Sequence, residues 1–80
     1  MKVTLHFVGM IQKVVDWKKK IELDLPENTT LEDALKEVGI DWKKTKEFGF
    51  VLIDKKKISD KDFLLTHDSI VKVFPKSFGG

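Results

Sequence analysis

The last six residues of the sequence have the types and spacing that point most clearly to chemistry. Pro75 follows an apolar run, and Gly79 and Gly80 close the sequence. Because glycine has no Cβ, we expect residues 75–80 to form a thin, flexible tail that ends in a bare carboxylate. Such a tail can enter a narrow channel in another protein. The simpler interpretation is a frayed chain end, since two closing glycines arise by chance in about one chain in 200.

The imidazoles and carboxylates are weaker candidates for chemistry. His6 falls on the polar side of a predicted strand and His67 in a predicted turn, and neither has neighbours that would complete a metal site or a catalytic triad. Asp60, Asp62 and Asp68 are better explained by turns and helix caps. No phosphate-binding glycine loop or zinc motif occurs. We therefore predict no metal site and no bound cofactor.

Composition narrows the function classes further. The sequence has no cysteine, so any sulfur chemistry cannot use a side-chain thiol of this chain. All 15 basic residues are lysine, whereas arginine is the usual reader of phosphate and guanine, so we expect no nucleic-acid partner. Lysine runs at 18–20 and 55–57 fit solvated turns and guarded strand edges, with a basic patch for nucleic acid or an acidic partner as the alternative. No apolar run approaches a membrane span, which predicts a soluble cytoplasmic protein without membrane association.

The elements that position the tail follow from apolar periodicity. Residues 2–8 and 20–25 alternate and predict two strands, whose connection is either a long hairpin loop or a short helical turn. Residues 31–38 carry the apolar stripe of a helix that ends at Gly39. Thr30 with Asp33 predicts its N-terminal cap; Thr29 with Glu32 is the alternative.

The second half of the chain predicts two more strands. They span residues 50–53 and 70–74. A charged turn at 54–57 follows the first of them, and Ile58 after the turn is expected to pair briefly. Residues 59–65 predict a capped helical turn that carries Leu64 or Leu65 inward. Two hairpins over one helix predict an α+β roll, with a domain at 1–74 and a flexible tail at 75–80.

The last strand is the most continuously apolar, so we expect it in the middle of the sheet beside the first strand. Pairing should end at Phe74, because Pro75 has no N–H to donate. Alternation buries either Val71 with Val73 or Ile70 with Phe74, and the other set must face outward. Exposed apolar patches mark binding sites, so we predict a docking surface beside the tail.

With these elements and this ending, the whole chain resembles the ubiquitin-like β-grasp sulfur carriers, and among them the small subunit of molybdopterin synthase. The resemblance rests on the opening strand with Phe7, on residues 21–26 followed by 30–35, and on the strand–proline–three residues–Gly-Gly ending. It implies a β-grasp roll whose mixed four- to five-stranded sheet packs on one main helix. The chain departs from the family pattern at residues 12–13, 52–54 and 67–69.

The resemblance implies a mechanism centred on Gly80. An adenylyltransferase of the ubiquitin-activating type would adenylate its carboxylate with Mg-ATP, and a persulfide donor would convert it to a thiocarboxylate. The tail, with Phe78 and Gly79, would then enter an acceptor enzyme, expected to be the large molybdopterin synthase subunit that forms the dithiolene on a cyclic pyranopterin monophosphate. Phe74, Pro75 and Ile70 are expected to contact the partner.

On this view the protein is a carrier subunit of a sulfurtransferase complex, a monomer when free, and its partners supply catalysis. Phe78 is bulkier than the small residue usual before the glycines of the family, and its role stays open. The alternatives are a protein modifier joined to lysines through Gly80, a sulfur carrier for thiamine or tRNA thiolation, and a plain interaction domain whose glycines are incidental.

Overall fold

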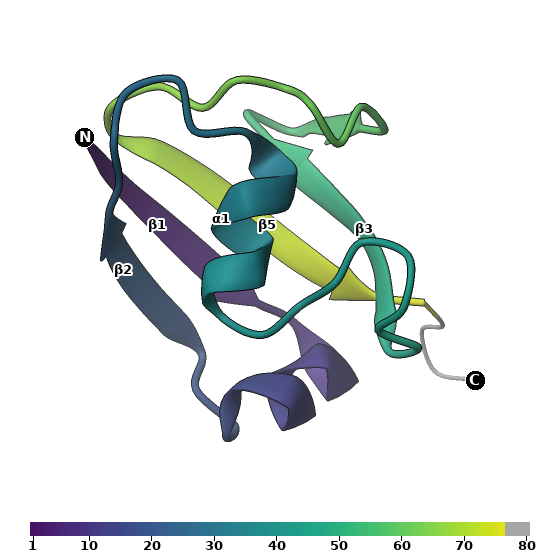
Figure 1. The fold of residues 1–80 in the computed structure, drawn as a ribbon. Helices are drawn as coiled ribbons and strands as arrows, with labels where there is room; N and C mark the ends of the chain where they lie inside the picture. Colours follow the sequence, from purple (N-terminus) through teal and green to yellow (C-terminus); the bar gives the residue numbers. More distant parts are fainter. Residues whose placement is uncertain (77–80) are drawn as a thin grey trace.

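The fold consists of five strands, one α-helix and one short 3-10 helix. The computed structural model describes residues 1–76 of the sequence. In chain order the elements are β1 (Lys2–Phe7), η1 (Gly9–Val15), β2 (Lys20–Asp24), α1 (Leu31–Glu37), β3 (Phe48–Ile53), β4 (Lys56–Ile58) and β5 (Ser69–Pro75). Figure 1 shows α1 lying across one face of the sheet. The predicted α+β roll is confirmed.

The strands form one mixed sheet in the order β2-β1-β5-β3-β4. Parallel pairing joins β1 to β5, with Leu5 opposite Val71 and Phe7 opposite Val73, and the other neighbours are antiparallel. The predicted central position of the last strand beside the first is therefore confirmed. Because β1 and β5 run in the same direction, Pro75 ends β5 at the same end of the sheet at which β1 passes into η1.

The core lies between α1 and the inner face of the sheet. Alternation along β1 turns Val3, Leu5 and Phe7 inward, and all three are buried. The apolar stripe of α1 meets them through Leu31, Ala34 and Leu35, each with no exposed surface. Full burial of one such aliphatic side chain stabilises a protein by about 1.5–3 kcal/mol, which exceeds the intrinsic preference of this seven-residue helix for its own conformation.

The start of α1 follows the first of the two predicted caps. The Asp33 N–H donates to the Thr30 hydroxyl oxygen at 3.2 Å, so Thr30 is the N-cap residue. The N–H groups of Leu31 and Glu32 donate to the carbonyl oxygens of Phe63 and Lys61 at 2.8 and 2.9 Å. These bonds satisfy donors that every helix start leaves without an intrahelical acceptor.

The same bonds explain why the helical turn predicted at residues 59–65 is wrong. This segment is a turn followed by extended chain, and Leu64 forms an isolated antiparallel bridge with Thr30. The Asp60 carboxylate accepts the Asp62 N–H at 2.9 Å, which fixes the turn locally. Extended chain offers its carbonyls to α1, whereas a helical segment would use them internally. Of the two leucines proposed to face inward, Leu65 is the buried one.

Two connections differ from or refine the expectations. The segment between β1 and β2 contains η1, so the short helical alternative is the observed one. The charged turn between β3 and β4 is shorter than predicted: Asp54 and Lys55 turn with positive φ, as hairpin turns of the tight primed types require, and Lys56 already belongs to β4. None of the helices within residues 1–76 has the length and apolar character needed to cross a membrane.

Candidate functional site

The face of the sheet opposite α1, called the outer face below, carries the side chains that β5 turns away from the core. Val71 and Val73 are fully buried on the inner face, so Ile70, Lys72 and Phe74 lie on the outer face. This settles which set the last strand buries. Ile70 is 51% exposed, an unusual value for an isoleucine on a central strand.

Phe74 forms a stacked pair with Phe50 of β3, its partner in the β-ladder. The ring centroids are 4.8 Å apart and the planes are tilted by only 1°. The ammonium group of Lys57 on β4 lies 5.4 Å from the centroid of the Phe50 ring. Aromatic stacking and cation–π contact each contribute on the order of 0.5–1.5 kcal/mol, so this half-buried pair is a fixed part of the outer face.

A hollow of about 270 Å³ opens on the same face beside Ile70. Leu52 and Ile70 supply apolar surface, and its charged lining comes from Asp54, Lys55 and Lys72. Ile70 and Phe74 are four residues apart on one strand, or about 13 Å at 3.3 Å per residue. The hollow and the aromatic pair therefore lie along one line that leads toward the end of β5.

The end of β5 corrects the prediction that pairing stops at Phe74. Pro75 is buried and pairs with Phe48, and the Lys76 N–H donates to the Glu47 carbonyl at 3.0 Å. The missing proline donor costs nothing here. The Val73 carbonyl faces β1, where it accepts the Val8 N–H at 3.0 Å. The Pro75 nitrogen, two residues later, faces the same side but lies beyond the end of β1, so no strand there requires a donor.

Two glycines enclose Pro75. A Cβ built on Gly49 would overlap the carbonyl of Pro75 and lie 2.7 Å from the Cα of Lys76. A Cβ on Gly9, whose φ is +64°, would lie 3.4 Å from the proline ring. Gly49 also lies at a register shift between Phe48 and Phe50, as expected for a bulge. These contacts fix the direction in which the chain leaves the sheet.

The structure brings together only part of the predicted site. Ile70 and Phe74 share the outer face, whereas Pro75 is buried. The predicted tail residues Phe78, Gly79 and Gly80 lie outside the described residues. Sequence reasoning assigned no site role to Phe50 or Gly49, and it considered Lys57 only as part of a basic run. The signals were present: Phe50 directly precedes the buried Val51 and therefore lies on the opposite face, and a lone glycine in a strand is a bulge signal.

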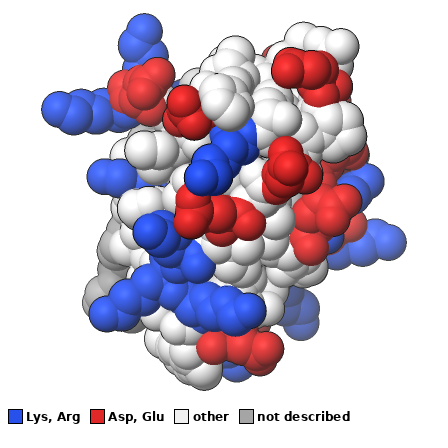
Figure 2. All heavy atoms as spheres, turned by 90° about the vertical axis from the view of Figure 1, so that its left-hand side faces the viewer, with Lys and Arg blue, Asp and Glu red and all other residues white. Residues whose placement is uncertain are grey.

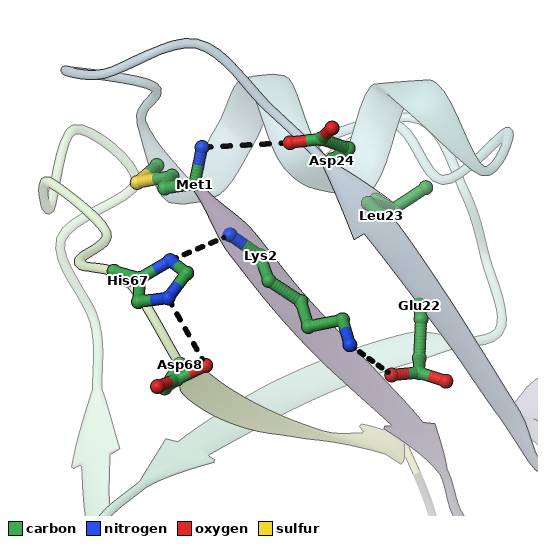
Figure 3. Close-up of a pocket in the computed structure, with 7 residues that line it drawn as sticks. All are labelled: Met1, Lys2, Glu22, Leu23, Asp24, His67 and Asp68. Atoms are coloured by element: carbon green, nitrogen blue, oxygen red, sulfur yellow. Dashed lines mark hydrogen bonds and ion pairs between the residues drawn. The ribbon is translucent and has the colours of Figure 1, made fainter.

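Two of the polar residues considered for catalysis, His67 and Asp68, lie away from the end of β5. A hollow of about 520 Å³ surrounds the start of β1 (Figure 3). Here the Lys2 N–H donates to His67 Nδ1 at 3.0 Å, the Lys2 ammonium pairs with Glu22 at 3.5 Å, and Asp68 lies 3.5 Å from His67 Nε2. Since β1 and β5 are parallel, this end is a strand length from Pro75. Within residues 1–76, no three His, Asp or Glu side chains gather as a metal site requires.

Asp41 is the carboxylate whose titration the fold changes most clearly within the described chain. Its side chain accepts the N–H groups of Lys44 and Lys43 at 2.9 and 3.0 Å, and these two bonds lower the pKa of Asp41 below its usual value. The loop that it fixes connects α1 to β3 and carries Trp42, whose ring packs 5.1 Å from that of Phe48. The role of Asp41 is to hold the strand that pairs with β5.

The chain has no match among protein-family models, and no curated protein matches its sequence. Solved structures do match it over their full lengths. SAMP1 from Haloferax volcanii, a small archaeal modifier protein, superposes with a TM-score of 0.77 at 15% identity, with 100% of both chains covered. The Pyrococcus furiosus protein assigned as molybdopterin converting factor subunit 1 gives 0.74 at 22% identity, covering 96% of this chain and 99% of that one.

A third match comes from a complex. The structure of subunits 1 and 2 of the molybdopterin-converting factor from Helicobacter pylori contains a chain that superposes with a TM-score of 0.65 at 16% identity, with 100% of both chains covered. At these identities the likeness is one of fold. Together with the mixed five-stranded sheet and its single covering helix, it shows that the chain has the ubiquitin-like β-grasp fold of molybdopterin converting factor small subunits and small archaeal modifier proteins.

Proposed function

We propose that this protein is a sulfur carrier whose Gly80 carboxylate is adenylated and then thiocarboxylated. The observation that carries the proposal is the end of β5, where the glycine-bounded exit of Pro75 adjoins the Phe50–Phe74 pair on the outer face. A docking surface beside a fixed chain exit suits a protein that presents its terminus to an enzyme. The resemblance of the Gly79-Gly80 ending to that of the β-grasp sulfur carriers supplies the chemistry.

The chemistry requires activation, because a carboxylate oxygen is a poor leaving group. An adenylyltransferase partner would use Mg-ATP to form the acyl adenylate with loss of pyrophosphate. A persulfide sulfur then attacks the carbonyl carbon and displaces AMP, and a second thiol cleaves the resulting S–S bond to leave the thiocarboxylate. Because this chain has no cysteine, both sulfur groups must belong to partners. ATP-dependent activation implies that the reaction takes place in the cytoplasm.

For the acceptor we propose the large subunit of a molybdopterin synthase. The fold likeness to small subunits of molybdopterin converting factors supports this choice, and one of those subunits was solved with its second subunit. The carrier would supply the sulfur atom and the docking face, while the large subunit supplies catalysis. Thiamine and tRNA thiolation are the other acceptor pathways that the same activated terminus serves.

A second candidate function is protein modification through Gly80, and the likeness to SAMP1 favours it. Here a target lysine amine, rather than a persulfide, attacks the activated carbonyl and forms an isopeptide bond. The two functions share the adenylation step and differ in the nucleophile. Their products can therefore be separated by mass.

Mass spectrometry of the protein purified from its native cells tests both functions. It also shows whether Gly80 carries an unmodified carboxylate. A sulfur carrier gives an intact mass in which one oxygen is replaced by sulfur. A modifier gives target lysines that carry Ser-Phe-Gly-Gly after trypsin digestion, because trypsin cleaves after Lys76. A chain without Gly80 is the control. If the native chain yields neither product while its adenylyltransferase is present, both functions are wrong.

A further inference from the structure

Strand register aligns three lysines, a histidine and a leucine across the outer face. Lys20 on β2 pairs with His6 on β1, and His6 pairs with Lys72 on β5. Lys72 pairs in turn with Leu52 on β3, and Leu52 with Lys57 on β4. Paired residues present their side chains on the same side of a sheet, so this set forms one line over all five strands. The line, called the cationic row below, contains three lysines and an imidazole and no carboxylate.

The three lysines of the cationic row form no ion pair with any residue of the described part of the chain. The ion pairs there use other bases: Lys2 with Glu22, Lys61 with Glu32 and Asp62, and the Met1 amine with Asp24. Glu22, the outer-face carboxylate nearest Lys20 along β2, is therefore already engaged. Viewed from the β2 side, lysine side chains gather at the lower left, while acidic ones lie over the middle, the right and the upper left (Figure 2).

The hollow beside Ile70 adjoins the cationic row through a shared member, Lys72. An apolar side chain that entered the hollow would contact Ile70 and Leu52. Flanking carboxylates would lie near Lys72 and Lys55, two lysines against the one carboxylate of the lining, Asp54. We propose that the outer face binds an acidic protein segment that carries one aliphatic or aromatic anchor for this hollow. This inference rests on the proposed function, because the segment would belong to an enzyme that receives the Gly80 tail.

Nucleic acid is the other polyanion to consider, and the aromatic pair argues against it. Single-stranded nucleic acids bind sheets by stacking bases on free aromatic faces. One face of the Phe50 ring is covered by Phe74, and Lys57 lies over the ring as well, so the stacking surface is already occupied. The sequence also lacks arginine, the residue that reads bases and phosphates with paired donors.

Peptide display on the immobilised full chain tests the inference without a purified partner. From a random dodecapeptide library we expect enrichment of peptides that combine several Asp or Glu residues with at least one Leu, Ile, Phe or Trp. Lys72→Glu should weaken binding of the enriched peptides about tenfold at low salt and less at high salt. The matched control, Lys36→Glu, reverses an exposed charge on α1, across the molecule, and should leave binding unchanged.

Neutral or basic selected peptides, equal effects of the two substitutions, or no specific peptides would each overturn the inference. Tighter, Lys72-dependent binding of oligouridylate than of any selected peptide would overturn it in favour of nucleic acid. Both variants should keep the wild-type thermal melt, since both side chains are exposed. Repeating the selection with a chain that lacks Gly79 and Gly80 separates the docking inference from the proposed function. If acidic peptides are selected but the native protein forms no thiocarboxylate in cells, only the proposed function is wrong. If the thiocarboxylate forms but acidic peptides are not selected, only the docking inference is wrong.

Discussion

Pro75 owes its position to two residues without side chains. Gly49 has no room for a Cβ because the backbone of Pro75 and Lys76 passes directly over it, and Gly9 touches the proline ring from the η1 side. The glycines serve different needs: the φ of Gly9 is positive, whereas at Gly49 the constraint is space. The exit of the chain from the sheet is thus set by packing rather than by the stiffness of proline alone.

Replacing Gly49 with alanine is expected to lower the free energy of unfolding by about 1–3 kcal/mol, because the new methyl group must push β5 away from β3. Urea denaturation followed by tryptophan fluorescence measures the change. Lys46→Ala, an exposed change three residues earlier, is the control and should stay within about 0.5 kcal/mol. A Gly49→Ala protein as stable as the control would contradict the close approach.

Deletion of Gly80 is expected to abolish adenylation without lowering the melting temperature, since Gly80 is outside the buried core and the strands described for residues 1–76. ATP–pyrophosphate exchange with the adenylyltransferase measures the first property and differential scanning calorimetry the second. If the shortened chain supports normal ATP–pyrophosphate exchange, both functions proposed for Gly80 are wrong.

The pairing of β3 with β5 unites the aromatic stack, the hollow and the chain exit in one element pair. Replacing Phe74 with glutamate should weaken binding of the acceptor subunit by about 2 kcal/mol or more, the range of a central interface residue, because it removes apolar area and adds a charge. Isothermal titration calorimetry with the large subunit provides the measurement. Phe63→Glu, which changes an exposed ring on the segment next to α1, should bind normally. Equal losses of affinity in the two variants would contradict a docking surface at Phe74.

The loop before β3 gives the fold an acid-sensitive point. A carboxyl whose pKa is lower in the folded than in the unfolded protein stabilises the fold above its unfolded pKa, and this stabilisation is lost as pH falls through the folded pKa. Asp41, whose pKa lies below 3.8 in the fold, is such a group. Asp41→Asn should therefore be slightly less stable than wild type near about pH 6, with the difference shrinking as pH falls through the lowered pKa of Asp41. Urea midpoints measured across this pH range check this; a constant difference would contradict it.

Local sequence signals predict correctly those elements that depend on residues close to one another in the chain. The alternation of Val3, Leu5 and Phe7 and the Thr30 cap are read correctly, because period and capping depend on near neighbours. The helical turn at 59–65 and the strand end at Phe74 are wrong for a common reason. Each is decided by a distant partner, α1 in one case and the Gly49 bulge in the other, that no local pattern encodes. The stacking of Phe50 on Phe74 escapes sequence reasoning because it depends on which strand lies beside β5.

At the scale of the whole molecule, the parallel pair β1–β5 is the centre on which both halves of the sheet depend. Leu5 is fully buried on it, opposite Val71. Leu5→Ala should lower the free energy of unfolding by about 2–5 kcal/mol, because it leaves a cavity under α1. Thr4→Ala, on the outer face of the same strand, should cost much less. Chemical denaturation of both variants provides the comparison; similar losses would place the centre of stability elsewhere.

The pairing of the first strand with the last also has a consequence for synthesis in the cell. The central strand is the last to be translated, so the sheet cannot close until residue 75 is available, and contacts between such distant segments form slowly. The residues after Pro75 are made later still. An activating enzyme that docks on the outer face would therefore meet a complete surface only on finished chains, and a prematurely terminated chain would lack both its strand β5 and its reactive end. Under the proposed function, only chains with a complete sheet would therefore be activated.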